Sequence, residues 1–128
     1  MRRAFALAAV SLALVGATAA GAAPTSGIRG RIVEGPTCPV ESNPPQPGCA
    51  PRPILATLRI HALGGRRIHI ARSDGQGVFG LRLPPGTYVV VAQRTGASPF
   101  PRPPAPFDVS VHAGHFTTVT IRYDTGIR

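Results

Sequence analysis

The chain of 128 residues contains no lysine, only two cysteines and only five acidic residues. The absence of lysine excludes an intramolecular isopeptide cross-link, because that chemistry needs an uncharged lysine amine beside an Asn or Asp. The two cysteines are not spaced as Cys-x-x-Cys, which argues against a reactive dithiol. No second long apolar run follows the N-terminal segment, so we expect no membrane span beyond it.

The N-terminal segment has the order of a secretory signal peptide. Arg2 and Arg3 form a positive start, residues 4–20 are apolar and small, and Ala20-Gly21-Ala22 offers the small residues that a signal peptidase recognises. We therefore predict a signal peptide over residues 1–22, cleaved after Ala22, and a single exported domain over residues 23–128. An uncleaved membrane anchor is the alternative reading. Either way the domain is extracytoplasmic, secreted or held at the cell envelope.

All 14 basic residues are arginine. Removal of Arg2 and Arg3 leaves 12 arginines against five acidic residues, a net charge of +7. One explanation is a nucleotide composition that favours arginine codons. The other is attraction to an anionic polymer such as a cell-wall phosphate polymer or an acidic glycan, since a cationic surface raises the local concentration of such a partner.

Cys38 and Cys49 lie within a proline-rich stretch, residues 36–53, that shows no periodic pattern. In an exported chain two nearby cysteines predict a disulfide rather than a metal site. The loop between them cannot hold itself in place by burial, so we expect the cross-link to fix it, with a gain of about 2.5–3 kcal/mol in the chain-entropy account.

The rest of the chain alternates apolar and polar residues at period two, which indicates β-strands. Turn signals separate the strands at residues 64–65, 74–77, 84–86 and 112–115. The predicted strands cover residues 28–34, 56–62, 67–72, 79–83, 87–94, 107–111 and 119–123.

The fifth of these strands, residues 87–94, is apolar on both sides, so we predict that it is central and covered on both faces. Residues 95–106 contain five prolines and no periodicity, which is typical of a polyproline-like crossing on the surface. Seven short strands at near-regular spacing predict an all-β fold, a seven-stranded antiparallel Greek-key β-sandwich with one disulfide.

The four histidines are candidates for a metal site. His61 and His69 are predicted on the outward faces of neighbouring strands, where they could share a cation if directly opposed. His112 and His115 flank a turn. We interpret all four as solvated surface residues and predict no metal, cofactor or catalytic residue. The match of Asp124-Thr125-Gly126 to an aspartic-protease signature we interpret as chance, with Asp124 a polar end to the last strand.

Residues 73–79, Ser-Asp-Gly-Gln-Gly-Val-Phe, with the Leu-Pro-Pro-Gly-Thr-Tyr and valine-rich strand of residues 83–91, carry a family resemblance. The pattern resembles carboxypeptidase regulatory-like and transthyretin-like (prealbumin-like) domains, and also collagen-adhesin B-type repeats, over roughly residues 27–123. The insert at residues 35–39 and the last residues, 123–128, look like those of a small group of uncharacterised secreted bacterial proteins. The resemblance implies an accessory, adhesive or structural role. The chain lacks the Tyr-Arg-Gly-Ser ending of transthyretin-like hydroxyisourate hydrolases, so that enzyme activity is not expected.

Two classes of function follow from these patterns. The first is a non-catalytic exported module with a structural, adhesive or protein-interaction role at the bacterial cell envelope, where the partner is an anionic polymer or another envelope protein. The second is a module that binds a small ligand, a glycan or an anionic polymer near the cysteine loop. Arg29, Arg31 and Arg59 are the predicted anion contacts. No nucleic-acid partner is expected, and the oligomeric state stays open.

Overall fold

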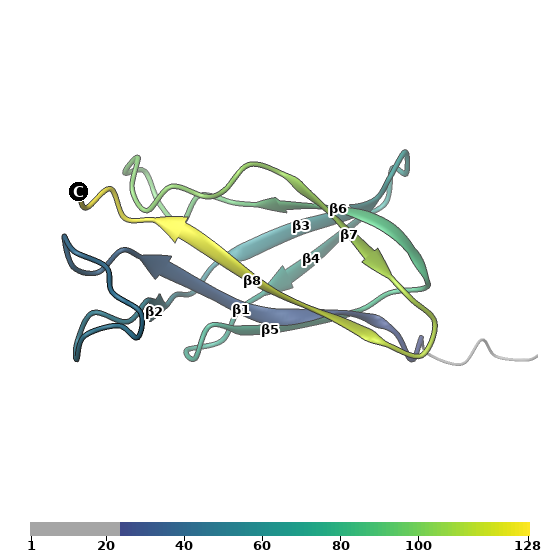
Figure 1. Ribbon diagram of the computed structural model, residues 1–128. Helices are drawn as coiled ribbons and strands as arrows, with labels where there is room; N and C mark the ends of the chain where they lie inside the picture. The colour runs from purple at the N-terminus through teal and green to yellow at the C-terminus, as the bar shows by residue number, and fades with distance from the viewer. Residues whose placement is uncertain (1–23) are drawn as a thin grey trace, which may run out of the picture.

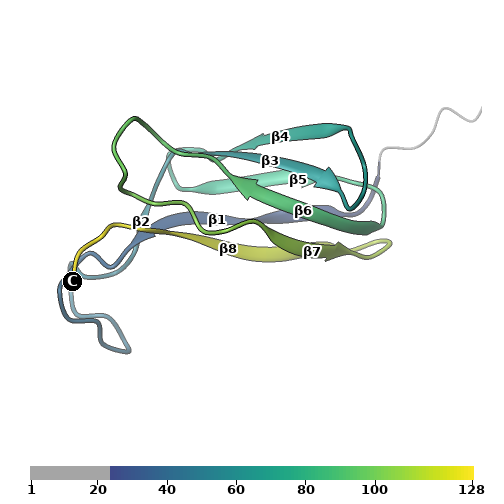
Figure 2. The same cartoon turned by 90° about the horizontal axis from the view of Figure 1, so that it is seen from above.

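The computed structural model describes residues 24–128, which form two β-sheets packed face to face (Figures 1 and 2). The predicted signal peptide over residues 1–22 lies outside the described residues. The strands are β1 (Gly27–Gly35), β2 (Arg52–Pro53), β3 (Thr57–Ala62), β4 (Ile68–Arg72), β5 (Val78–Arg82), β6 (Gly86–Ala92), β7 (Phe107–Val111) and β8 (Phe116–Asp124). The all-β class and the disulfide are confirmed. No helix in this part of the chain has the length and apolar character needed to cross a bilayer.

The first sheet is built around β1. On one side β8 pairs with β1 in parallel along its whole length, and on the other side β5 and then β2 pair with it antiparallel. The second sheet has the order β4-β3-β6-β7 and is antiparallel throughout.

The prediction of seven antiparallel strands is wrong in two respects. Residues 24–128 form eight strands, and the β1–β8 pair is parallel. β2 is two residues long, too short to show an alternating pattern. The parallel pair escaped prediction because alternation is the same for either strand direction, and tight turns fix only the pairing of strands that are neighbours along the chain.

The core lies between the sheets and comes from the inward positions of the alternating pattern. The buried apolar residues are Ile28, Ile32, Ala56, Leu58, Ile60, Ala71, Phe79, Leu83, Tyr88, Val90, Ala92, Val109, Val111, Ile121 and Tyr123. Two buried serines support it, since Ser26 Oγ donates to the Leu83 carbonyl oxygen at 2.7 Å and Ser73 Oγ donates to that of Ile54 at 2.7 Å. No side-chain polar atom that is buried among the described residues lacks a partner.

The outer face of the second sheet differs from its prediction. β6 is central, but Val89 and Val91 on its outer face are only half-buried. Ile68 and Ile70 of β4 are 46% and 49% exposed. An apolar strand covered by a second layer and one that exposes an apolar face have the same sequence pattern, which explains the error.

The proline-rich crossing at residues 95–106 includes one pairing that the sequence did not indicate. Arg102 forms an isolated antiparallel bridge with Asp124, and their backbone N–H groups donate to each other's carbonyl oxygens at 2.7 and 2.8 Å. Phe100 packs against Gly126, where its ring atoms leave no room for a side chain. The crossing is therefore fixed to the last residues of the chain.

Candidate functional site

The outer face of the first sheet carries a group of exposed arginines that we call the arginine face: Arg29, Arg31, Arg82 and Arg122. The strand register places Arg29 beside Thr118 and Arg31 beside Thr120, so a threonine row of β8 runs along the arginine row of β1. The Arg29 guanidinium also lies over the Phe116 ring, 5.6 Å from its centroid. Alternation along each strand explains why these arginines point outward, because each of them neighbours a buried or half-buried residue in its strand.

Most of the positive charge on the arginine face is uncompensated. Within residues 24–128 the ion pairs are Arg52 with Glu34, Arg122 with Glu41, and Arg128 with Asp124. The Asp74 carboxylate is used locally and accepts the backbone N–H groups of Gln76 at 2.9 Å and Val78 at 3.0 Å. Arg29, Arg31 and Arg82 thus have no acidic partner in the described part of the chain and remain open to an anion.

The structure separates the three arginines predicted as anion contacts. Arg29 and Arg31 lie together on the arginine face. Arg59 pairs with Ile70 and Val91 on the outer face of the second sheet, on the opposite side of the sandwich. Sequence reasoning missed Arg82, whose outward direction follows from alternation but whose position beside β1 depends on the long-range β1–β5 pairing.

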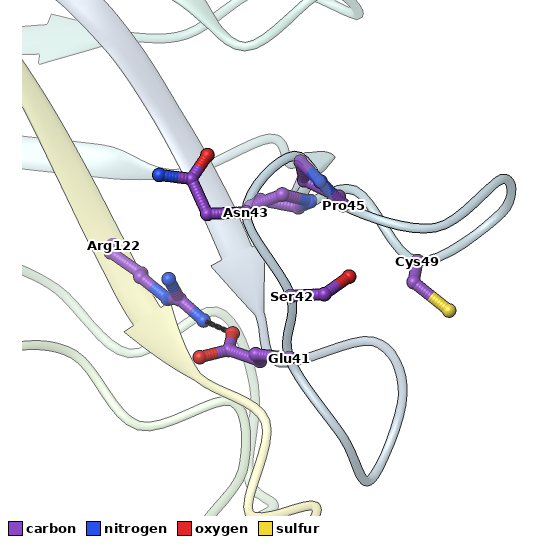
Figure 3. A pocket seen from close by; sticks show the side chains of 7 residues that line it. Glu41, Ser42, Asn43, Pro45, Cys49 and Arg122 are labelled. Atoms are coloured by element: carbon purple, nitrogen blue, oxygen red, sulfur yellow. Dashed lines mark hydrogen bonds and ion pairs between the residues drawn. The ribbon is translucent and has the colours of Figure 1, made fainter.

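The arginine face leads into a hollow under the cysteine loop, shown in Figure 3. The hollow has a volume of about 320 Å³ and is lined by Glu41, Ser42, Asn43, Pro45, Cys49, Pro51 and Arg122. The disulfide closes the loop above it across a sequence separation of 11 residues. Arg122 extends from β8 toward the loop and forms an ion pair with Glu41, so one side chain belongs both to the arginine face and to the hollow.

Gly35 makes the position of Arg122 possible. A Cβ on Gly35 would lie 2.8 Å from Nη2 of Arg122 and 3.1 Å from its central guanidinium carbon. The guanidinium therefore packs against Gly35 of β1 as it reaches Glu41. The remaining loop contacts are local, with Thr37 Oγ1 donating to the Ala50 carbonyl oxygen at 3.1 Å.

The Asp-Thr-Gly triplet at the end of β8 has a structural use. The Arg128 guanidinium and the Gly126 backbone N–H donate to the Asp124 carboxylate and lower its pKa to about 2. Thr125 Oγ1 donates to the Pro36 carbonyl oxygen at 2.5 Å, which ties the chain end to the beginning of the cysteine loop. The Asp124 carboxylate is engaged as an acceptor by the chain's own groups, consistent with its interpretation as the polar end of the last strand.

The histidines do not converge. His61 pairs with Ile68 on the outer face of the second sheet, whereas His69 pairs with Ile60 and takes the inward-pointing side. The prediction that His61 and His69 share the outward face is therefore wrong, because the hairpin register places them one residue out of phase. His112 and His115 lie at the turn between β7 and β8. No group of three or more metal-ligating side chains occurs in residues 24–128.

Comparison with known proteins gives a likeness in fold. No family model and no curated protein matches the sequence. One similar solved structure is GBS52, the minor pilin of Streptococcus agalactiae, with 17% identity and a TM-score of 0.54 over 80% of this chain and 46% of the pilin. Another is the Bacillus anthracis TIE protein, with 14% identity and a TM-score of 0.49 over 78% of this chain and 17% of that protein. The chain spans less than half the length of the pilin that it matches.

Proposed function

We propose that this chain is an exported, non-catalytic module of the bacterial cell envelope that binds an anionic polymer through the arginine face. The observation that carries the proposal is the group formed by Arg29, Arg31 and Arg82, three exposed arginines on one face of the first sheet without an acidic partner among residues 24–128. Such a face attracts polyanions and increases their rate of association.

The geometry of the face fits a repeating anion better than a single one. Outward residues two apart on a strand are about 6.6 Å apart, so Arg29 and Arg31 present two charges at a fixed interval along β1. Guanidinium groups bind phosphate or carboxylate through two parallel hydrogen bonds. The hydroxyls of Thr118 and Thr120 on the neighbouring strand β8 add hydrogen-bond donors and acceptors beside Arg29 and Arg31.

Three further features support the non-catalytic and extracytoplasmic parts of the proposal. The Cys38–Cys49 disulfide suits an oxidising compartment. The hydroxyl of Ser73 and the carboxylate of Asp124 both engage the chain's own backbone. The fold resembles that of a domain of a minor pilin. The carboxypeptidase regulatory-like assignment, its Greek-key connectivity and the signal peptide stay predictions.

The test measures retention of the exported, disulfide-bonded protein on cell-wall material that carries a phosphate polymer. The variant R29E/R31E is expected to lose retention. R66E/R67E is the matched control, because it reverses the same number of charges at two exposed arginines in the turn between β3 and β4, outside the arginine face. Retention of the parent protein should fall steeply with salt, since exposed charges are screened over about 8 Å at physiological ionic strength. Equal losses in R29E/R31E and R66E/R67E would show that net charge acts rather than this face.

The hollow under the cysteine loop favours a second candidate function, the binding of a small ligand or glycan. Its lining offers the carboxylate of Glu41, the hydroxyl of Ser42 and the amide of Asn43, which are groups that bind sugar hydroxyls. Binding that survives high salt, is lost in Asn43→Ala and is unchanged in R29E/R31E would favour this candidate over the polymer.

A further inference from the structure

The outer face of the second sheet is unlike the arginine face and has no role in the proposed function. We call it the valine face and define it by Ile68 and Ile70 of β4, Arg59 and His61 of β3, Val89 and Val91 of β6, and Asp108 of β7. Its isoleucines are about half exposed and its valines half-buried. These apolar side chains lie on both sides of Arg59 and His61 on one sheet face, and apolar side chains that are grouped on a face mark an interaction site more often than isolated ones do.

The register arranges these residues in strips that alternate across the sheet. One row runs Ile68, His61, Val89, Asp108, because His61 pairs with both Ile68 and Val89, and Val89 pairs with Asp108. In the next row Arg59 lies between Ile70 and Val91. The face thus carries two isoleucines on β4, which ends in the exposed Arg72, then Arg59 and His61 on β3, two valines on β6 and one carboxylate, Asp108, on β7.

We propose that the valine face binds a second copy of this chain, with a two-fold axis that runs along β6 in the plane of the interface. A two-fold dimer uses the same patch on both partners, so the patch must be complementary to itself. Rotation about β6 brings Val89 and Val91 onto the valines of the other copy. The same rotation places β3 of each copy over β7 of the other.

This axis satisfies the charges on the face. It sets His61 of one copy opposite Asp108 of the other and Arg59 one row farther along β3, about 6.6 Å from that point and within reach of a long arginine side chain, and it does so twice. An axis along β3 would oppose Arg59 with itself, and an axis along β7 would oppose Asp108 with itself, each with a repulsion between like charges. Face-to-face sheets pack about 10 Å apart, a gap that an arginine and an aspartate reaching from opposite sides can bridge.

The dimer leaves the arginine faces free. The first sheet forms the other layer of each sandwich (Figure 2). In the dimer the two arginine faces therefore point outward and away from each other. If the proposed function holds, the dimer is bivalent and gains avidity for a long polymer. The dimer itself does not depend on polymer binding.

The experiment measures the mass of the exported, disulfide-bonded protein by sedimentation equilibrium over a series of concentrations. The parent protein is expected to form a dimer. Val91→Glu is expected to give a monomer because it places two carboxylates at the centre of the interface. The control is Val78→Glu on the outer face of the first sheet, an equally simple exposed substitution that should leave the dimer intact, since Val78 is 44% exposed there. Circular dichroism confirms that each variant is folded.

A charge exchange tests the axis. Arg59→Asp and Asp108→Arg should each raise the dissociation constant about tenfold, and the double variant R59D/D108R should restore it, because the pairing is re-formed with the signs exchanged. A parent protein that is monomeric at every concentration overturns the proposal. So does a dimer that tolerates Val91→Glu, or a double variant no better than the single ones. Polymer retention by the Val91→Glu monomer separates the two proposals, because it should persist through the arginine face.

Discussion

The first sheet joins strands from the two ends of the described chain, whereas the second is assembled mainly from strands that follow one another. β1 pairs with β8 from Gly27 opposite Phe116 to Gly35 opposite Asp124. In the second sheet β3 and β4 form a hairpin, and β6 and β7 are consecutive. A sheet closed by distant segments forms only when the whole chain is in place, so a local change in it has a global effect.

β1 of the first sheet also differs from β3 and β4 of the second in its glycine content. β1 contains glycine at three of its nine positions, and β3 and β4 contain none. A Cβ on Gly30 would overlap the carbonyl oxygen of Val119 and lie 2.8 Å from its carbonyl carbon. Both atoms belong to the backbone of the parallel partner strand and cannot move aside. The first sheet is therefore the part of the molecule that depends most on single residues.

The substitution Gly30→Val tests this dependence and has the largest expected effect. It forces β1 and β8 apart, so we expect a loss of about 4 kcal/mol or more in the free energy of unfolding, enough to unfold a small domain. Gly80→Val in β5 is the control, because no atom lies within 4 Å of a Cβ there. It should change stability by no more than about 0.5 kcal/mol. Urea unfolding curves measure both, and equal midpoints for the two variants would contradict the comparison.

Much of this architecture could be predicted from local sequence, and the exceptions have physical reasons. Alternation assigned the inward residues of β1, β5 and β8, and Asp74 with Gly77 marked a turn that the structure contains. The pairing of β1 with β8 could not be predicted because no local pattern records which distant strand is a neighbour. The exposed valines of β6 could not be predicted either, since an apolar strand carries no mark of whether a second layer covers it.

The candidate site was likewise predictable where local alternation decides and unpredictable where long-range pairing decides. Alternation predicted that Arg29 and Arg31 point outward, and this holds. The sequence did not indicate that Arg59 lies on the other sheet, because the sheet to which a strand belongs depends on long-range pairing. For the same reason Arg82 and Arg122 were missed as members of the arginine face. The role of Arg122 also needed knowledge that Gly35 leaves it space to reach Glu41.

Removal of the disulfide tests whether the end of the first sheet, where β2 pairs with β1, needs the cross-linked loop for its stability. The double variant C38S/C49S should lose about 2.5–3 kcal/mol, the chain-entropy value for a loop with a sequence separation of 11. Hydrogen exchange should increase at β2 and the adjoining end of β1 more than in β3 and β6. A stability unchanged from that of the oxidised protein would show that the Arg122–Glu41 pair and the tail contacts fix the loop by themselves.

The substitution Ser73→Ala tests the connection from β4 to β5, which joins the two sheets. Its expected effect on stability is smaller. The Ser73 hydroxyl donates to the Ile54 carbonyl oxygen at 2.7 Å and accepts the Ala56 backbone N–H at 2.8 Å. Ser73→Ala leaves that buried N–H without its partner, at a cost of about 1–3 kcal/mol. Ser110→Ala is the control, because Ser110 is an exposed residue of β7. Thermal unfolding compares the two, and equal shifts would remove the special role of Ser73.

Substitution of Tyr123 is expected to have the smallest effect on stability at neutral pH and a separate effect at high pH. Its side chain is fully buried in β8, and its hydroxyl donates to the Gln93 carbonyl oxygen at 2.5 Å, so it links the first sheet to the chain just beyond β6. Burial raises the pKa of Tyr123 to about 12 from its ordinary value of 10.0. At neutral pH, Tyr123→Phe should cost about 1 kcal/mol for the lost hydrogen bond.

The sign of the pH effect follows from the raised pKa. The folded protein holds the phenol proton more tightly than the unfolded chain, so this contribution to stability is complete below pH 10 and disappears as the pH rises through about 12. Burial also raises the pKa of Tyr88, which donates to the Pro84 carbonyl oxygen at 2.6 Å, so part of the slope belongs to Tyr88. Urea unfolding between pH 9 and pH 12 should therefore show a shallower decline for Tyr123→Phe than for the parent protein. Parallel declines would mean that the hydroxyl ionises without disturbing the contact between the sheets.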